Sequence, residues 1–104
     1  MLDMDRREYN ISPIEVNRVL ISKVIIDPHF ESKHDDHMDD DLIIMLVKRL
    51  NGRIEVPEAQ DDDGFSYFAT LLEVGEKQYR LVWLLEDNSI YVGVLNAYRD
   101  DRKE

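Results

Sequence analysis

The C-terminal third of the chain constrains the fold most, because it contains three segments typical of β-strands in close succession. These segments are residues 65–74, 78–86 and 89–99. The two junctions, Gly75-Glu76 and Asp87-Asn88, hold residues that tolerate a positive φ and therefore suit hairpin turns. We predict a three-stranded antiparallel meander.

Two-residue turns at both junctions determine the register of this meander. Phe68 then lies opposite Trp83, and Trp83 lies opposite Val92 on the next strand. One face is apolar throughout, so helices are expected to cover it. The predicted members of this core face are Phe68, Leu72, Tyr79, Leu81, Trp83, Leu85, Ile90, Val92 and Val94.

The opposite face of the meander is mixed in character. Its predicted members are Tyr67, Ala69, Leu71, Arg80, Val82, Leu84, Tyr91, Gly93, Leu95, Ala97 and Arg99. Gly93 at its centre would let another group approach the backbone closely. One interpretation is that acidic loops or a partner subunit cover this face, with Arg80 and Arg99 paired to carboxylates. The other is that the face forms a concave site for an anion or RNA.

A helix and a further strand are predicted near the N-terminus. Ser12, Pro13 and Glu15 form the pattern of a capped helix start, so we expect a helix from residue 12 to about residue 20. The short β-branched segment 23–26 predicts a strand, which Pro28 would end.

A second helix is expected from Asp39 or Asp40 to Asn51-Gly52. Consecutive aspartates suit the positive end of a helix dipole, and apolar residues recur at helical spacing up to Leu50. These elements together predict an α+β fold, with two helices packed on one face of a small, mainly antiparallel sheet that ends in the C-terminal three-stranded meander.

The length of 104 residues predicts a single domain, residues 1–104. Residues 1–10 and 100–104 are expected to be flexible. Two acidic loops are expected at residues 27–41 and 53–64.

The formal net charge of −10 is concentrated in two segments. Residues 27–41 hold seven acids and one base, residues 55–63 hold five acids and no base, and the rest of the chain holds 11 acids and 12 bases. The distribution excludes phosphate binding over the whole surface, which requires clustered lysine and arginine. The distribution does not exclude a small local site that binds an anion.

Other classes of protein are excluded by composition. No apolar run approaches the roughly 20 residues that a helix needs to cross a bilayer, and the charged N-terminus is not expected to act as a signal peptide. The chain has no cysteine, so disulfides, zinc–thiolate sites and thiol catalysis are excluded. We expect a cytoplasmic protein without a cofactor.

Three histidines, His29, His34 and His37, lie within the first acidic segment. They could hold a metal with nearby carboxylates, act as a general acid or base, or be solvated. Their spacing fits no standard zinc signature, so no metal ligand is predicted. The run Asp61–Asp63 lacks the spacing of a calcium-binding loop and is expected to be solvated.

Short motifs of the meander resemble those of one known superfamily. The motifs are Tyr79–Trp83, Glu86–Asn88, Tyr91–Val94 and Asn96–Arg99, with His29, Lys33 and His34 upstream. They resemble the small bacterial ribonuclease superfamily of RelE/ParE-type toxins, barnase and colicin nuclease domains.

The resemblance implies a RelE-like ribonuclease of the toxin–antitoxin type that cuts RNA without metal through the ribose 2′-hydroxyl, or a divergent or inactive member. Histidine would act as acid or base, arginine would stabilise the phosphate, and tyrosine would orient or stack a base. The implied site residues are His29, His34, Arg80, Arg99 and Tyr98 for catalysis, and Tyr67 and Tyr91 for substrate binding.

The net charge favours a second hypothesis, a non-catalytic acidic interaction protein that binds a basic protein partner. Its partner-binding residues would be Asp35, Asp36, Asp61, Asp62 and Asp63. The same charge disfavours RNA as a partner, and no membrane partner is expected. A homodimer that hides the mixed sheet face is a third hypothesis.

Overall fold

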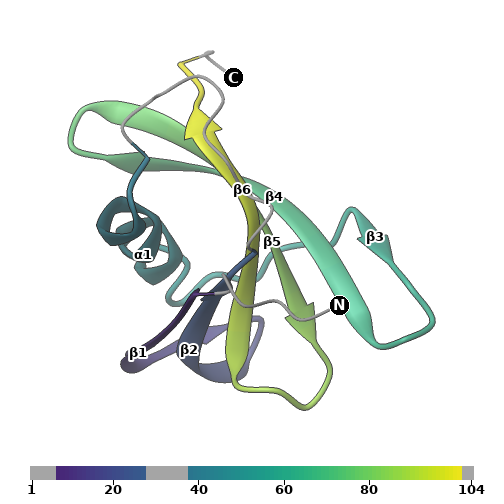
Figure 1. Ribbon diagram of the computed structural model, residues 1–104. Coiled ribbons are helices and arrows are strands. Elements are labelled where there is room, and N and C mark those ends of the chain that lie inside the picture. Colours follow the sequence, from purple (N-terminus) through teal and green to yellow (C-terminus); the bar gives the residue numbers. More distant parts are fainter. Residues whose placement is uncertain (1–6, 28–37, 102–104) are drawn as a thin grey trace.

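The computed structural model describes residues 7–27 and 38–101, which form one six-stranded sheet and one helix (Figure 1). The elements in chain order are β1 (Arg7–Val16), β2 (Val19–Ile26), α1 (Asp40–Lys48), β3 (Ala59–Gln60), β4 (Phe65–Val74), β5 (Lys77–Glu86) and β6 (Tyr91–Arg99). The strand order is β1-β2-β6-β5-β4-β3. The β2–β6 pair is parallel and the other pairs are antiparallel. No helix within these two ranges is long and apolar enough to cross a membrane.

The predicted α+β fold with two helices on one face is wrong, because the described residues form a six-stranded mixed sheet with a single short helix. The segment 12–20, predicted as a helix, is the β1–β2 hairpin. Asn17 and Arg18 both have positive φ, 52° and 64°, which makes a tight turn suited to the twist of two antiparallel strands. Ile14 and Val16 are both buried, so the spacing of apolar residues is that of a strand.

The predicted strand at residues 23–26 and the start of the second helix are confirmed. Residues 7–10, which were expected to be flexible, belong to β1, and the second helix ends before the expected Asn51-Gly52. Residues 23–26 lie in β2, which begins earlier, at Val19. Helix α1 begins after Asp39, whose side chain accepts a hydrogen bond from the Leu42 amide. The helix ends at Lys48, and Gly52 follows in the left-handed region at φ 86°.

The predicted register between β4 and β5 is confirmed, with Phe68 opposite Trp83 and Leu72 opposite Tyr79. The rings of Phe68 and Trp83 stack with their centroids 4.1 Å apart, and this contact strengthens the pairing of β4 with β5. The prediction that Ile90 belongs to the core is wrong, since 56% of its surface is exposed.

The predicted register between β5 and β6 is also wrong. Trp83 lies opposite Val94 rather than Val92, because β6 begins at Tyr91 and the connection is longer than two residues. A further register shift between Val82 and Trp83 places Ala97 opposite Leu81. Since a shift of one residue exchanges the two faces of a strand, Ala97 points into the core instead of away from it.

The core lies between α1 and one face of the sheet, which we call the inner face. The opposite face is the outer face. In Figure 1, α1 lies between the β1–β2 hairpin below it and the β4–β5 hairpin above it. The fully buried side chains come from the helix and from the strands, and they are Val16, Ile21, Val24, Ile26, Ile43, Leu46, Val47, Leu50, Leu81, Trp83, Val92 and Val94.

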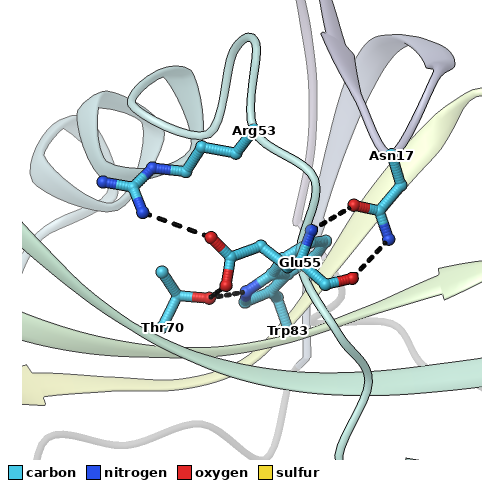
Figure 2. Close-up of polar contacts among 5 residues, drawn as sticks. All are labelled: Asn17, Arg53, Glu55, Thr70 and Trp83. Carbon is cyan, nitrogen blue, oxygen red and sulfur yellow. Dashed lines mark hydrogen bonds and ion pairs between the residues drawn. The ribbon is translucent and has the colours of Figure 1, made fainter.

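The residues that follow α1 connect the β1–β2 hairpin to the middle of the sheet (Figure 2). We call residues 51–58 the crossing segment. The Asn17 side chain accepts a hydrogen bond from the Glu55 amide and donates one to the Glu55 carbonyl. The Asn17 amide donates to the Arg53 carbonyl, and the Gly52 amide donates to the Glu15 carbonyl. These hydrogen bonds hold the crossing segment against the end of the β1–β2 hairpin.

The crossing segment reaches the core through one buried hydroxyl. Thr70 on β4 donates to the Glu55 carboxylate, with 3.4 Å between the oxygens, and accepts a hydrogen bond from the Trp83 indole at 3.0 Å (Figure 2). Trp83 is fully buried and Thr70 is 4% exposed. No buried side-chain polar atom lacks a partner in the part of the chain that the structure describes. The Thr70 hydroxyl thus provides a hydrogen-bond acceptor for the indole N–H, the only polar group of the Trp83 side chain, and it links the core to Glu55.

Replacing Thr70 by valine tests this link, because valine keeps the shape of threonine and removes the hydroxyl. We expect Thr70→Val to lower the free energy of unfolding by about 1–3 kcal/mol, since the Trp83 indole N–H would be buried without an acceptor. Thr70→Ser, which retains the hydroxyl, is the control, and its free energy of unfolding should fall by less than that of Thr70→Val. Urea unfolding monitored by Trp83 fluorescence measures both, and a valine variant as stable as the serine variant would contradict the role of the hydroxyl.

Candidate functional site

The two arginines predicted to bind phosphate do not share a face of the sheet. Arg80 lies opposite Tyr98, and Arg99 lies opposite Tyr79, which is buried on the inner face. Adjacent residues of a strand point to opposite faces, so Arg80 and Tyr98 are on the outer face and Arg99 is not. The prediction of a common face is wrong because the register shift in β6 was not visible in the sequence.

Each arginine also has a carboxylate partner from the end of β6. The Arg80 Nε donates to Asp100 Oδ2 at 3.2 Å, and Asp100 is only 6% exposed. The Arg99 Nε donates to Asp101 Oδ1 at 2.8 Å at a more exposed position. These pairings match the interpretation in which sheet arginines pair with nearby carboxylates.

The centre of the outer face is filled by the chain itself. Gly93 is buried, and a Cβ added to it would lie 2.8 Å from Leu84 Cδ1. Leu84 lies directly opposite Gly93 on β5. The space that the sequence analysis assigned to an approaching group is therefore occupied by the Leu84 side chain.

The tyrosines predicted to bind a substrate use their hydroxyls within the chain. The Tyr91 hydroxyl donates to Glu86 Oε1 at 2.7 Å, and the Tyr67 hydroxyl donates to Asp61 Oδ2 at 2.8 Å. The hydrogen bond to Asp61, with smaller contributions from desolvation and from the negative charge of Asp61, raises the pKa of Tyr67. Both hydroxyls therefore stabilise carboxylates.

The predicted histidine site and part of the predicted partner site lie outside the described residues. These residues are His29, His34, Asp35 and Asp36, and they stay predictions. Within residues 7–27 and 38–101, no group of three histidine, aspartate or glutamate side chains could hold a metal ion.

The aspartate run 61–63 is better ordered than the expected solvated loop. Asp61 Oδ1 accepts hydrogen bonds from the amides of Asp63, at 2.9 Å, and Phe65, at 3.1 Å. The Phe65 amide contributes most to lowering the pKa of Asp61, followed by the Tyr67 hydroxyl. Asp61 thus organises the turn before β4, as aspartate side chains commonly do for the backbone two residues on. Asp62 and Asp63 remain exposed.

Two turns lie together at this end of the sheet. The Asp87 amide donates to the Gly64 carbonyl at 2.8 Å, and the Asp61 amide donates to the Phe65 carbonyl at 3.0 Å. The turn after β5 therefore contacts the turn before β4. We call residues 56–68 and 84–91 the acidic end. They contain six acids and no lysine or arginine: Glu58, Asp61, Asp62, Asp63, Glu86 and Asp87.

A cavity of about 490 Å³ opens at the acidic end. Val19, Phe68 and Leu85 form part of its apolar lining, and Glu86 and Asp87 lie at the same site. No lysine or arginine lines it. This cavity was not predicted from the sequence, because its residues come from β2, β3, β4, β5 and three connecting segments, and only the fold brings them together.

No protein-family model matches the chain, and no curated protein or solved structure matches it. The resemblance to RelE-like toxins stays a prediction that these comparisons do not test.

The ordered state of Asp61 predicts a specific pH dependence. Folding lowers the pKa of this carboxyl, so the ionised carboxylate stabilises the folded chain. This contribution to stability is fully present above the unfolded-state pKa and is lost as the pH falls through the folded-state pKa. We expect Asp61→Asn to be less stable than the wild type at pH 7, with a smaller difference near pH 2.5. Urea unfolding at both pH values measures this, with Asp62→Asn as the control. An equal difference at both pH values would show that the Asp61 charge has no such role.

Proposed function

We propose that this chain is a non-catalytic interaction domain that acts in the cytosol and binds a protein partner with a basic surface. The observation that carries the proposal is the acidic end, whose two segments hold six acids and no lysine or arginine and line part of a cavity. The lack of cysteine suits a reducing compartment.

The exposure of the acids supports this proposal. Glu58, Asp62, Asp63 and Asp87 are all exposed. Like charges gathered on one surface create a potential that speeds the approach of an oppositely charged partner and helps to orient it. The ordered turn at Asp61 holds the neighbouring acids in place, which lowers the entropy lost on binding.

Two observations count against the ribonuclease hypothesis. Arg80 and Arg99 are on opposite faces of the sheet, so they do not converge on one phosphate. Each also donates to a carboxylate, which reduces the positive charge available for a transition state. The histidines of that hypothesis lie outside the described residues.

An RNA cleavage assay separates the two functions. We expect the purified chain to leave RNA intact in the absence of metal, because Arg80 and Arg99 lie on opposite faces of the sheet and do not converge on one phosphate. Gel electrophoresis of a labelled RNA measures this. Cleavage that is lost in His34→Ala and Arg80→Ala would contradict the proposal and favour the ribonuclease.

A charged peptide tests the acidic end directly. The probe is a fluorescent peptide of lysines, and the variant is Asp62→Asn/Asp63→Asn. We expect binding to weaken roughly twofold to tenfold and to depend less on salt, because two exposed charge contacts are lost. Fluorescence anisotropy at two salt concentrations measures both effects.

The matched control removes the same charge from the other end of the hairpin. Glu73→Gln/Glu76→Gln changes two exposed acids at and beside the β4–β5 turn, far from the acidic end along β4. It should leave binding close to that of the wild type. Equal weakening in both variants would mean that only net charge matters, which would contradict a defined binding surface.

A further inference from the structure

The lining of the cavity at the acidic end combines an apolar part with polar residues, among them Glu86 and Asp87. Phe68 on β4 is 3% exposed, and Val19 and Leu85 pack against the core. Pro57 from the crossing segment completes the apolar part of the lining. The volume of about 490 Å³ lies within the range of small-molecule sites and leaves room for one apolar side chain.

Hydrogen bonds on several sides hold the cavity open. The Asn17 side chain is joined to the Glu55 backbone, and the Gln60 side chain donates to the Ser66 hydroxyl at 3.0 Å. The Asp87 amide donates to the Gly64 carbonyl on the neighbouring turn. These contacts connect the walls to one another, so the cavity exists before an occupant arrives.

The charges at the cavity select its occupant. Glu86 and Asp87 line it, while no lysine or arginine does. The rest of the acidic end adds Glu58, Asp62 and Asp63 on exposed turns. An anion would be repelled here, whereas an apolar group flanked by cations would meet both an apolar lining and opposite charge. Val56, next to Pro57 in sequence, and Ile90, two residues after Asn88, are exposed apolar residues of the same segments.

We propose that the cavity binds one apolar side chain of a lysine- or arginine-rich peptide segment of the partner. This inference rests on the proposed function and goes beyond it by naming the anchor and the place where it is held. The acids provide attraction to the basic segment, and the cavity provides the preference for an apolar residue within it.

Two peptides of equal charge test the anchor. Both have eight lysines, and the central residue is leucine in one and serine in the other. We expect the wild type to bind the leucine peptide about tenfold more tightly, because a leucine side chain is removed from water. Fluorescence anisotropy measures the ratio. Equal affinity for the two peptides would overturn the inference.

Ser66→Phe fills the cavity, because Ser66 lines it and lies on a strand that accepts aromatic residues. This variant should bind both peptides with the affinity that the wild type has for the serine peptide. Gln78→Phe is the matched control, since it adds the same ring without a charge change at the far end of β5. It should retain the tenfold preference. A preference that persists in Ser66→Phe would overturn the inference.

A second measurement does not depend on the folding of a variant. In methyl NMR spectra of the wild type, the leucine peptide should shift the resonances of Val19 and Leu85 more than the serine peptide does. Equal chemical-shift changes with the two peptides would contradict the inference that the cavity binds the apolar residue. If the anchor fails while salt-dependent binding is still weakened by Asp62→Asn/Asp63→Asn, the proposed function stands. If neither peptide binds, both proposals fail.

Discussion

The hydrogen bond from the Trp83 indole to the Thr70 hydroxyl joins the core of the sheet to the crossing segment. A fully buried indole needs an acceptor, and the Thr70 hydroxyl supplies it while also contacting Glu55. Glu55 is in turn joined through its backbone to Asn17 in the β1–β2 turn (Figure 2). One connected set of contacts therefore ties the centre of the sheet to its first hairpin, and α1 and the crossing segment are held between them (Figure 1).

The position of the cavity follows from this connection. Because the crossing segment is held against Asn17 and Thr70, the residues after it reach the start of β4, where β3 pairs with Tyr67 and Ser66. The turn before β4 then meets the turn after β5. Several basic side chains elsewhere are paired with carboxylates of the chain, namely Arg7, Lys23, Arg53, Arg80 and Arg99, while Asp62, Asp63 and Asp87 of these turns remain exposed. The surface charge that is left unpaired is thus mainly negative at this end.

The sequence predicted those parts of the fold that depend on local signals. The β4–β5 register followed from Gly75-Glu76, and α1 followed from its aspartates and apolar spacing. The β1–β2 hairpin was missed because Ser12, Pro13 and Glu15 also fit a helix start, and only pairing with β2 decides between the two. The face of Arg99 was missed because a bulge in β6 leaves no local signal. The cavity depends on contacts between distant segments, which composition and spacing do not reveal.

A basic partner segment should bind at the acidic end and not on the outer face of the sheet. Backbone amide NMR of the wild type, titrated with the leucine-containing lysine peptide, distinguishes the two locations. We expect chemical-shift changes concentrated in residues 57–66 and 85–90, with little change around Arg80 and Tyr98. Changes centred on Arg80, Leu84 and Tyr98, or spread evenly over the chain, would contradict it.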